Sequence, residues 1–223
     1  MPAPKKYLPH GIKILFEDNA LLIVDKPAGL LSVPARYERE ENALSLMTRW
    51  LKKGQAKSKK ELFAVNRLDR ETSGILVFAK SLALRERLHE HWEENEKIYR
   101  AVVAGTDFPS DAGTIESYLL QDADYRVHAL PPDTNPVPAN AQYAKTEYRV
   151  LSRGNGVSLV EIRLCTGRKN QIRVHFSQIG HPLIGDRMYG LGNRHRLKLH
   201  ACRFVFTHPV SRERLTVESP CPF

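Results

Sequence analysis

The stretch NRLDRETSGILVFA occupies residues 66–79 and contains two different kinds of sequence. Residues 75–79 are consecutively apolar, and a run of this length is typical of a buried strand. Residues 66–74 include two arginines, two acids, two hydroxyls and a glycine, which favour an irregular loop. The sequence therefore predicts a charged loop fixed to a rigid interior strand, an arrangement that often carries functional groups.

The remaining elements follow from turn residues and apolar periodicity. Helices are expected over residues 43–53, over residues 81–95 behind an N-cap at Ser81, and after Asn170, which is expected to cap the third helix. Further strands are expected at 12–17, 21–25, 97–105, 144–152, 157–164, 199–206 and 215–217. With a hairpin expected within residues 107–142, the count is about nine strands. They do not alternate regularly with helices, which predicts an α+β fold with a largely antiparallel mixed sheet flanked by a few helices. We expect one domain over residues 1–223, with residues 1–10 as a loose arm.

The charge balance indicates a polyanionic partner. The chain has 34 Lys+Arg and 25 Asp+Glu, a net charge of +9. Nucleic acid is the commonest such partner and an anionic membrane the second, although a merely basic protein is about as frequent on charge alone. Residues 161–214 hold nine Arg and two Lys against three acids. Since arginine binds phosphate in a bidentate fork, this region favours nucleic acid. The lysines that follow residue 51 are interpreted as a solvated face, with RNA contact a secondary alternative.

The cysteines and the hydropathy pattern bear on location. Three cysteines are scattered and no C-x-x-C occurs, so neither a disulfide framework nor a zinc cluster is indicated. No 18-residue apolar run and no signal-like N-terminal segment is present. We therefore expect a cytoplasmic protein that does not bind membranes.

Common cofactor and nucleophile motifs are absent. The sequence has no G-x-G-x-x-G, Walker loop, H-E-x-x-H or G-x-S-x-G, and its histidines are scattered. We expect no metal and no cofactor. Asp69 lies between Arg67 and Arg70, whose charges would keep it ionised as a nucleophile or general base. On spacing alone, the alternative that Asp69 caps a turn or pairs with Arg67 is favoured.

A resemblance to a known family changes that balance. Residues 66–74 resemble the R-L-D-x-x-T-S-G signature of the RluA family of RNA pseudouridine synthases. Other segments resemble the same family in the same order: KPAGL at 26–30, KIYRA at 97–101, TGRKNQIRVH at 166–175, GHPLIGD at 180–186, YG at 189–190, LHA at 199–201 and HP at 208–209. The resemblance runs from about residue 12 to the C-terminus. It is closest to the short RluA branch without an S4-like extension.

The resemblance implies a pseudouridine synthase catalytic domain and a cofactor-free isomerisation of uridine in structured RNA. The N1–C1′ bond breaks, the uracil turns, and C5 bonds to C1′. By resemblance, Asp69 is the catalytic carboxylate that attacks the nucleotide at the ribose or the base. Tyr99 packs against the uracil, and Arg173 pairs with Asp69.

The resemblance also implies how RNA is held. A stacked uridine must be flipped out to react, and Arg67 is placed by the motif to enter the vacated gap. Arg168, Lys169 and Thr72 are the other expected RNA contacts, the first two with phosphates. The expected substrate is ribosomal RNA, transfer RNA or both, and the expected state is a monomer.

Two positions depart from the family pattern, and two other functions stay open. The family usually has His where this chain has Asn66 and Asn170, so we hypothesise that these two side chains meet in a mutual hydrogen bond. The first alternative function is a non-catalytic RNA-binding or RNA-folding protein on the same scaffold, in which Asp69 is idle. The second is a metal-dependent nuclease, which is disfavoured because no acidic cluster is available to hold Mg²⁺.

Overall fold

The computed structural model describes residues 8–35, 41–53, 55, 57–192 and 195–223. The predicted loose arm falls mostly outside these residues, and Pro9–Gly11 form a short 3₁₀ turn. The chain divides into two compact units. Unit 1 comprises residues 1–95 and 201–222, and unit 2 comprises residues 96–200 and 223. One domain over residues 1–223 stays a prediction.

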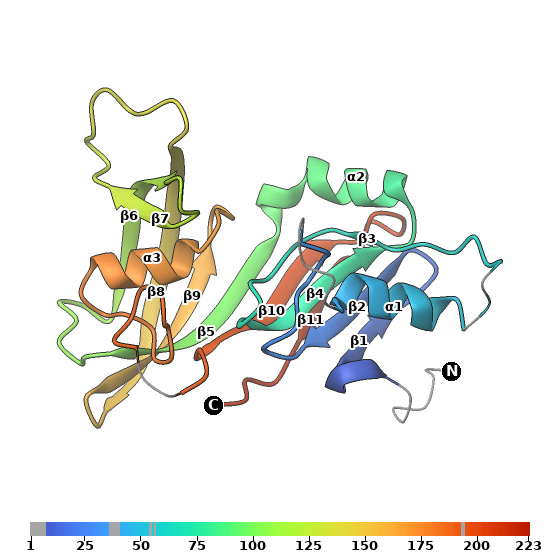
Figure 1. Ribbon diagram of the computed structural model, residues 1–223, viewed down its shortest axis with the longest axis horizontal. Helices are drawn as coiled ribbons and strands as arrows, with labels where there is room; N and C mark the ends of the chain where they lie inside the picture. The colour runs from blue at the N-terminus through green and yellow to red at the C-terminus, as the bar shows by residue number, and fades with distance from the viewer. Residues whose placement is uncertain (1–7, 36–40, 54, 56, 193–194) are drawn as a thin grey trace. The chain divides into compact units, whose positions relative to one another are not determined.

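Unit 1 is a sheet with two α-helices (Figure 1). Its strands run in the order β1-β2-β4-β10, with β3 paired to β4 and β11 paired to β10. The strand bounds are β1 Lys13–Glu17, β2 Leu21–Lys26, β3 Phe63–Ala64, β4 Ser73–Ala79, β10 Leu199–Thr207 and β11 Arg214–Glu218. The helices are α1 Ala43–Leu51 and α2 Leu82–Glu90.

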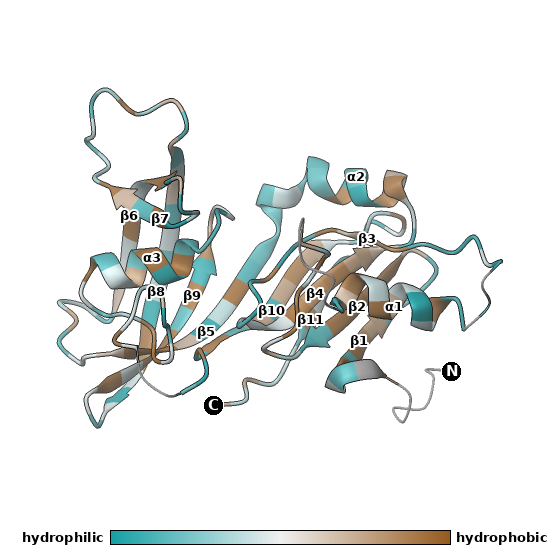
Figure 2. Cartoon of the chain, in the orientation of Figure 1, coloured by the Kyte–Doolittle hydropathy of each residue, from teal (hydrophilic) through white to brown (hydrophobic). Residues whose placement is uncertain are grey.

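The predicted interior strand is confirmed as β4, which is buried at every residue. Leu76 and Phe78 pack with β2 and with Leu46 and Met47 of α1. Figure 2 shows the corresponding apolar colouring along β2 and β4. The strand begins at Ser73, two residues before the apolar run. At Gly74 (φ +112°) an added Cβ would lie 2.3 Å from the carbonyl oxygen of Ala201, so glycine is required for β4 to approach β10 this closely.

The helix predicted over residues 81–95 is shorter in the structure. Ser81 is the N-cap as expected, accepting a hydrogen bond from the Leu84 amide at 3.3 Å. However, α2 ends at Glu90, and Trp92–Glu94 form a 3₁₀ turn. The Trp92 ring packs against Phe204 with centroids 5.5 Å apart. Acidic residues at the end of a helix also oppose its dipole. Tertiary packing of Trp92 therefore overrides the local helical pattern.

Unit 2 is an antiparallel sheet in the order β5-β9-β8-β6-β7, with α3 over one face (Figure 1). The bounds are β5 Glu96–Ala104, β6 Ala112–Gln121, β7 Val127–Leu130, β8 Gln142–Gly154, β9 Val157–Leu164 and α3 Gln171–Gln178. The β8–β9 turn at Asn155 and Gly156 has positive φ at both residues, as the Gly-Asn-Gly sequence predicts. The α+β class and the largely antiparallel pairing are confirmed.

One apolar cluster fixes α3 to this sheet. Ile172 and Phe176 of α3 pack against Ala101 and Val103 of β5, together with residues of β9. Tyr99 is half-buried against the same cluster. Since alternate residues of a strand share a face, Tyr99 lies on the face of β5 that α3 covers. No helix of the described residues is long and apolar enough to cross a membrane.

The core of unit 2 contains a buried histidine that predicts acid sensitivity. His175 of α3 is hydrogen-bonded to Ser117 Oγ at 3.0 Å and to Thr146 Oγ1 at 2.9 Å. Burial lowers its pKa from 6.5 to about 4. Between these pH values the unfolded chain binds a proton that the folded chain does not. We expect the free energy of unfolding to fall by roughly 2–4 kcal/mol as the pH falls from 6.5 to 4.

Urea unfolding at several pH values measures this effect. The variant His175→Asn should show a flatter dependence of unfolding free energy on pH, whatever its absolute stability. The matched control is His128→Asn, because His128 is exposed and paired with Asp122 on the surface. A His175→Asn profile parallel to that of the unmodified protein would contradict the assignment.

Candidate active site

The loop that carries Asp69 is held by its backbone. The Thr72 amide donates to the Asp69 carbonyl at 3.1 Å, which closes a turn immediately before β4. Ser32 binds both backbone polar groups of Leu68, the residue before Asp69. Its hydroxyl donates to the Leu68 carbonyl at 2.7 Å and accepts from the Leu68 amide at 2.9 Å. Leu68 is therefore bound to a residue 36 positions earlier in the chain.

The residue after Asp69 is held in the same way. The carbonyl of Arg70 accepts hydrogen bonds from Lys26 Nζ at 3.1 Å and from the Gly29 amide at 2.8 Å. Lys26 has no exposed surface, and its ammonium also donates to the carbonyls of Pro27 and Leu30 at 2.9 and 2.7 Å. Residues 26–32 thus grip the backbone on both sides of Asp69, and we call them the clamp segment.

Lys26 also sets the charge beneath the loop. Burial lowers its pKa to about 8, while the carboxylates of Asp69, Glu71 and Asp25 act in the opposite direction. An ammonium kept in the interior by three carbonyls is a strong electrostatic feature. At neutral pH it is charged, and this charge interacts electrostatically with the Asp69 carboxylate. Asp69 itself is half-buried.

Ser32 is the part of the clamp that mutation tests most cleanly. We expect Ser32→Ala to lower the free energy of unfolding by about 2–3 kcal/mol, because a buried amide and a buried carbonyl of Leu68 both lose their partner. Chemical denaturation measures the change. Ser110→Ala is the matched control, since Ser110 is exposed and its hydroxyl makes a long 3.5 Å contact. Equal effects of the two substitutions would contradict the clamp.

The other predicted residues of the loop divide into buried and exposed. Arg67 is exposed, whereas Thr72 is 2% exposed and lies in the turn. Asn66 bonds along β4: its Nδ2 donates to the Ile75 carbonyl at 3.3 Å, and its Oδ1 accepts from the Val77 amide at 2.8 Å. Asn66 thereby fixes the start of the loop to the strand that follows it.

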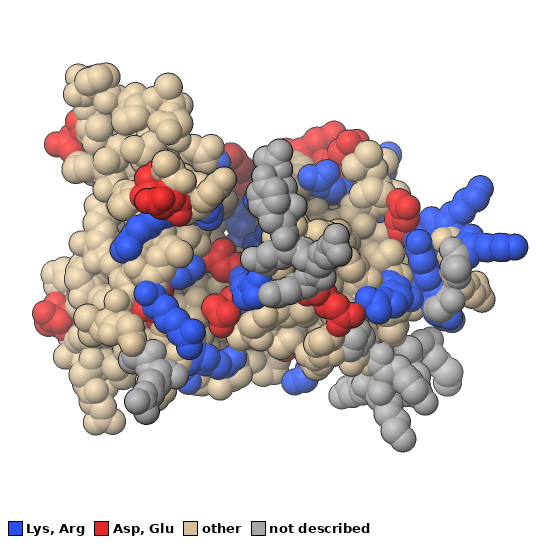
Figure 3. Space-filling model, in the orientation of Figure 1, with Lys and Arg blue, Asp and Glu red and all other residues tan. Residues whose placement is uncertain are grey.

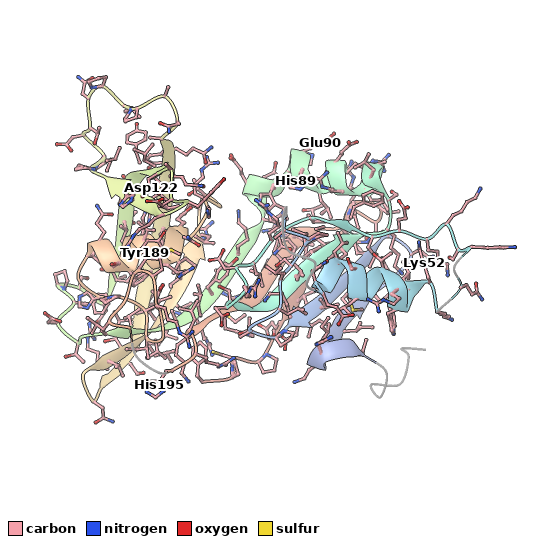
Figure 4. All side chains as sticks on the ribbon, viewed as in Figure 1. Lys52, His89, Glu90, Asp122, Tyr189 and His195 are labelled. Atoms are coloured by element: carbon pink, nitrogen blue, oxygen red, sulfur yellow. The ribbon has the colours of Figure 1, made fainter. Side chains whose placement is uncertain are left out.

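In unit 2, Arg173 is built into a network at the start of α3. Its Nε and Nη2 donate to Asp186 Oδ2 and Oδ1 at 2.7 and 2.8 Å, a bidentate pair. Its Nη1 donates to Asn170 Oδ1 at 3.2 Å. The Tyr189 ring lies 5.2 Å from the guanidinium carbon. Figure 4 labels Tyr189 beside α3. The guanidinium is therefore fixed in position and plane.

Asp186 is the anchor of this network. Its carboxylate is fully buried, and it also accepts from the amides of Met188 and Tyr189 at 2.9 and 3.0 Å. Burial raises the pKa of the carboxyl, but the hydrogen bonds and charge of Arg173 and the two amides outweigh this, so the pKa is lowered overall. Asp186 is thus held as a carboxylate in a buried setting.

The start of α3 corrects one detail of the sequence interpretation. Asn170 occupies the N-cap position, but it is left-handed (φ +54°) and its side chain makes no capping bond. Instead its Oδ1 accepts from Arg173, and its Nδ2 donates to Tyr189 Oη at 3.2 Å. The oxygens of Asn66 and Asn170 are both occupied by other donors. The hypothesis of a mutual hydrogen bond between them is not supported.

Arg168 and Lys169 lie exposed on the turn before α3. Arg168 Nε donates to the Tyr143 carbonyl at 3.1 Å, and Lys169 Nζ donates to the Tyr125 carbonyl at 3.0 Å. The ring of Tyr125, which is 70% exposed, lies 5.5 Å from the same ammonium. A cation and an aromatic face are thus presented together, as single-stranded nucleic acid binding requires.

Three supporting residues received no role from the sequence. Lys26, Ser32 and Asp186 lie in or beside the family-like segments, but each also bonds a residue farther along the chain: Arg70, Leu68 and Arg173, respectively. The sequence did contain a signal for Lys26 and Asp186. Each is a charged residue in a largely apolar segment, at 26–32 or 180–186, and such a residue needs a partner. Among the described residues, no three His, Cys, Asp or Glu side chains group as a metal site.

The comparisons with known proteins identify the family of the chain. Residues 20–178 match the family described as RNA pseudouridylate synthase. The chain is 35% identical over 218 residues to the dual-specificity RNA pseudouridine synthase RluA of Escherichia coli (strain K12), which covers 94% of this chain and 93% of the relative. It is 34% identical over 217 residues to the uncharacterized RNA pseudouridine synthase YhcT of Bacillus subtilis (strain 168), covering 95% and 69%. The chain therefore belongs to the RNA pseudouridylate synthase family, and within it to the RluA family.

A solved structure shows the same fold. Human RNA Pseudouridylate Synthase Domain Containing 4 superposes with a TM-score of 0.78 at 24% identity, covering 98% of this chain and 91% of that one. At this identity the likeness concerns the fold alone.

Proposed function

We propose that this protein isomerises specific uridines in structured RNA to pseudouridine, with Asp69 as the catalytic carboxylate. The observation that carries the proposal is the clamp segment, which fixes the peptides on both sides of Asp69 while leaving its carboxylate half-buried. A reacting group must be held to within a fraction of an ångström, and hydrogen bonds to the backbone on both sides of Asp69 contribute to that precision.

The proposed reaction needs an ionised carboxylate and no external reagent. Asp69 attacks the nucleotide, at the ribose or the base, and the N1–C1′ bond breaks. The detached uracil turns, C5 bonds to C1′, and the proton on C5 leaves while N1 gains one. No atom is gained or lost overall. The buried ammonium of Lys26 interacts electrostatically with the Asp69 carboxylate.

Tyr99 and Arg173 complete the proposed catalytic set. Tyr99 is proposed to pack against the uracil, which suits a half-buried ring set against an apolar cluster. Arg173 is proposed to pair with Asp69. The bidentate bond to Asp186 and the bond to Asn170 hold the guanidinium in one orientation, which suits a residue that positions a carboxylate.

The proposed RNA contacts use the exposed cations. Arg67 is proposed to fill the space left by the flipped base, and Arg168 and Lys169 to contact phosphates. Thr72 stays a predicted RNA contact. Ribosomal RNA, transfer RNA or both are the proposed targets. The names of relatives support this class, since they include a dual-specificity RNA pseudouridine synthase and a ribosomal large subunit pseudouridine synthase D. Action as a monomer in the cytoplasm is proposed with it.

Release of tritium from RNA labelled at C5 of uridine tests the function. Ribosomal and transfer RNA from a strain lacking the protein are the substrates, because their target uridines are unmodified. We expect release from at least one pool, and pseudouridine at the same position by sequence mapping. RNA binding without release from either pool would favour the non-catalytic RNA-binding protein.

A further inference from the structure

Five lysines follow the end of α1 within nine residues, and we call them the lysine segment: Lys52, Lys53, Lys57, Lys59 and Lys60. No acidic residue occurs in the sequence from Ala43 to Lys60. Figure 4 labels Lys52 at the end of α1, and Figure 3 shows Lys and Arg atoms gathered over the same end. The positive charge is therefore concentrated at one place on unit 1.

This charge is not neutralised locally. Lys52 is half-buried and the other four are exposed, and none of their ammonium groups pairs with another described residue. Two other cations of unit 1 are paired: Lys80 with Glu17 at 2.9 Å, and Arg49 with Glu41 at 3.1 Å. The lysine segment thus differs from Arg49, the basic residue just before it in α1.

Helix capping explains only part of the segment. Cations at the C-terminal end of a helix are favoured by the dipole, and this accounts for Lys52 and Lys53. The effect fades beyond the last turn, so it does not reach Lys57, Lys59 and Lys60. Like charges this close in sequence repel one another, and a polyanion would relieve the repulsion. The structure therefore favours a binding surface over the solvated face expected from sequence.

We propose that the lysine segment binds the phosphate backbone of the substrate RNA away from the nucleotide that is isomerised. This inference rests on the proposed function. Lysine is a flexible point charge and lacks the planar fork of arginine, so it suits contact with phosphates more than reading of bases. The segment should contribute affinity and salt dependence for any sequence and leave turnover at saturating RNA unchanged.

The test replaces Lys57, Lys59 and Lys60 together with glutamine. Three lost phosphate contacts should raise the Kd for ribosomal RNA fragments at least about 10-fold at 0.1 M salt, and should reduce the slope of log K against log salt by about 2. Fluorescence anisotropy across a salt series measures both. The triple Lys→Arg variant keeps the charge at the same positions and should bind like the unmodified protein.

The outcomes separate this proposal from the proposed function. If the glutamine variant and the unmodified protein had the same Kd and the same salt slope, the proposed RNA-binding surface would be refuted, even if the unmodified protein released tritium. If the glutamine variant bound RNA more weakly but the unmodified protein released no tritium, the RNA-binding surface would be supported and the proposed catalytic function would be contradicted. If the glutamine variant lost the ability to bind phosphatidylserine vesicles but bound RNA as the unmodified protein does, the lysine segment would be a membrane-binding surface and its RNA role would be refuted.

Discussion

The substitution Asp69→Asn should abolish pseudouridine formation. Asparagine has the shape of aspartate, but its amide is neither a nucleophile nor a base, and removing such a group typically lowers kcat by about 10⁴-fold or more. The loop should keep its conformation, because Ser32, Lys26 and Gly29 hold it through backbone atoms of Leu68 and Arg70. Tritium release in single-turnover conditions measures the rate, and anisotropy measures RNA binding.

The matched control for this substitution lies two positions along the chain. Glu71→Gln also removes a carboxylate that acts on Lys26, but Glu71 is exposed. We expect Glu71→Gln to retain turnover, and both variants to retain RNA binding. Comparable losses of turnover in the two would show that the loop's charge matters and not the Asp69 carboxylate. Retained turnover in Asp69→Asn would refute the proposed mechanism.

The sequence predicts those parts of the site that depend on local pattern. The apolar run after residue 74 identifies β4, and the charged residues before it identify a loop, because burial and turn chemistry are both local. Ser81 is recognisable as an N-cap for the same reason. The end of α2 is not recognisable, since it depends on the contact between Trp92 and Phe204. Residues more than 100 positions apart leave no periodic signal.

The supporting groups were beyond prediction for the same physical reason. Ser32 and Leu68 are separated by 36 positions, and Lys26 and Arg70 by 44. Asn170 illustrates a subtler limit. Its residue type and position both indicate a helix cap, yet its side chain bonds Arg173 and Tyr189. A polar side chain can satisfy several partners, and which one it takes depends on the tertiary structure.

The second large effect is expected for Asp186→Asn, which should lower both stability and turnover. The wild-type carboxylate accepts from four N–H groups, two of Arg173 and the amides of Met188 and Tyr189. An asparagine amide would set a donor against one of these donors and would remove the carboxylate charge from beside the Arg173 side chain, which is 13% exposed. Breaking a buried ion pair in this way costs about 3–5 kcal/mol.

Thermal unfolding and kinetics together measure the effect. At about 2–4 °C per kcal/mol for a chain of this size, Tm should fall by roughly 10 °C. Well below the lowered Tm, kcat should still be reduced while KM for RNA changes little, because Arg173 is proposed to act on Asp69 and has lost its fixed orientation. A lowered Tm with normal kcat would show that Asp186 only stabilises the fold.

Asp111→Asn is the matched control in the same unit. Asp111 pairs with Arg153 at 2.6 Å, a separation similar to that between Arg173 and Asp186, but its side chain is 79% exposed. Exposed ion pairs contribute little because water solvates each charge when the other is removed. We expect Asp111→Asn to leave Tm and kcat close to those of the unmodified protein. The contrast tests whether burial, and not the presence of an arginine–carboxylate pair, gives Asp186 its importance: equal effects would contradict that reasoning. A large effect confined to Asp186 would identify the network at the start of α3 as the device that orients Arg173.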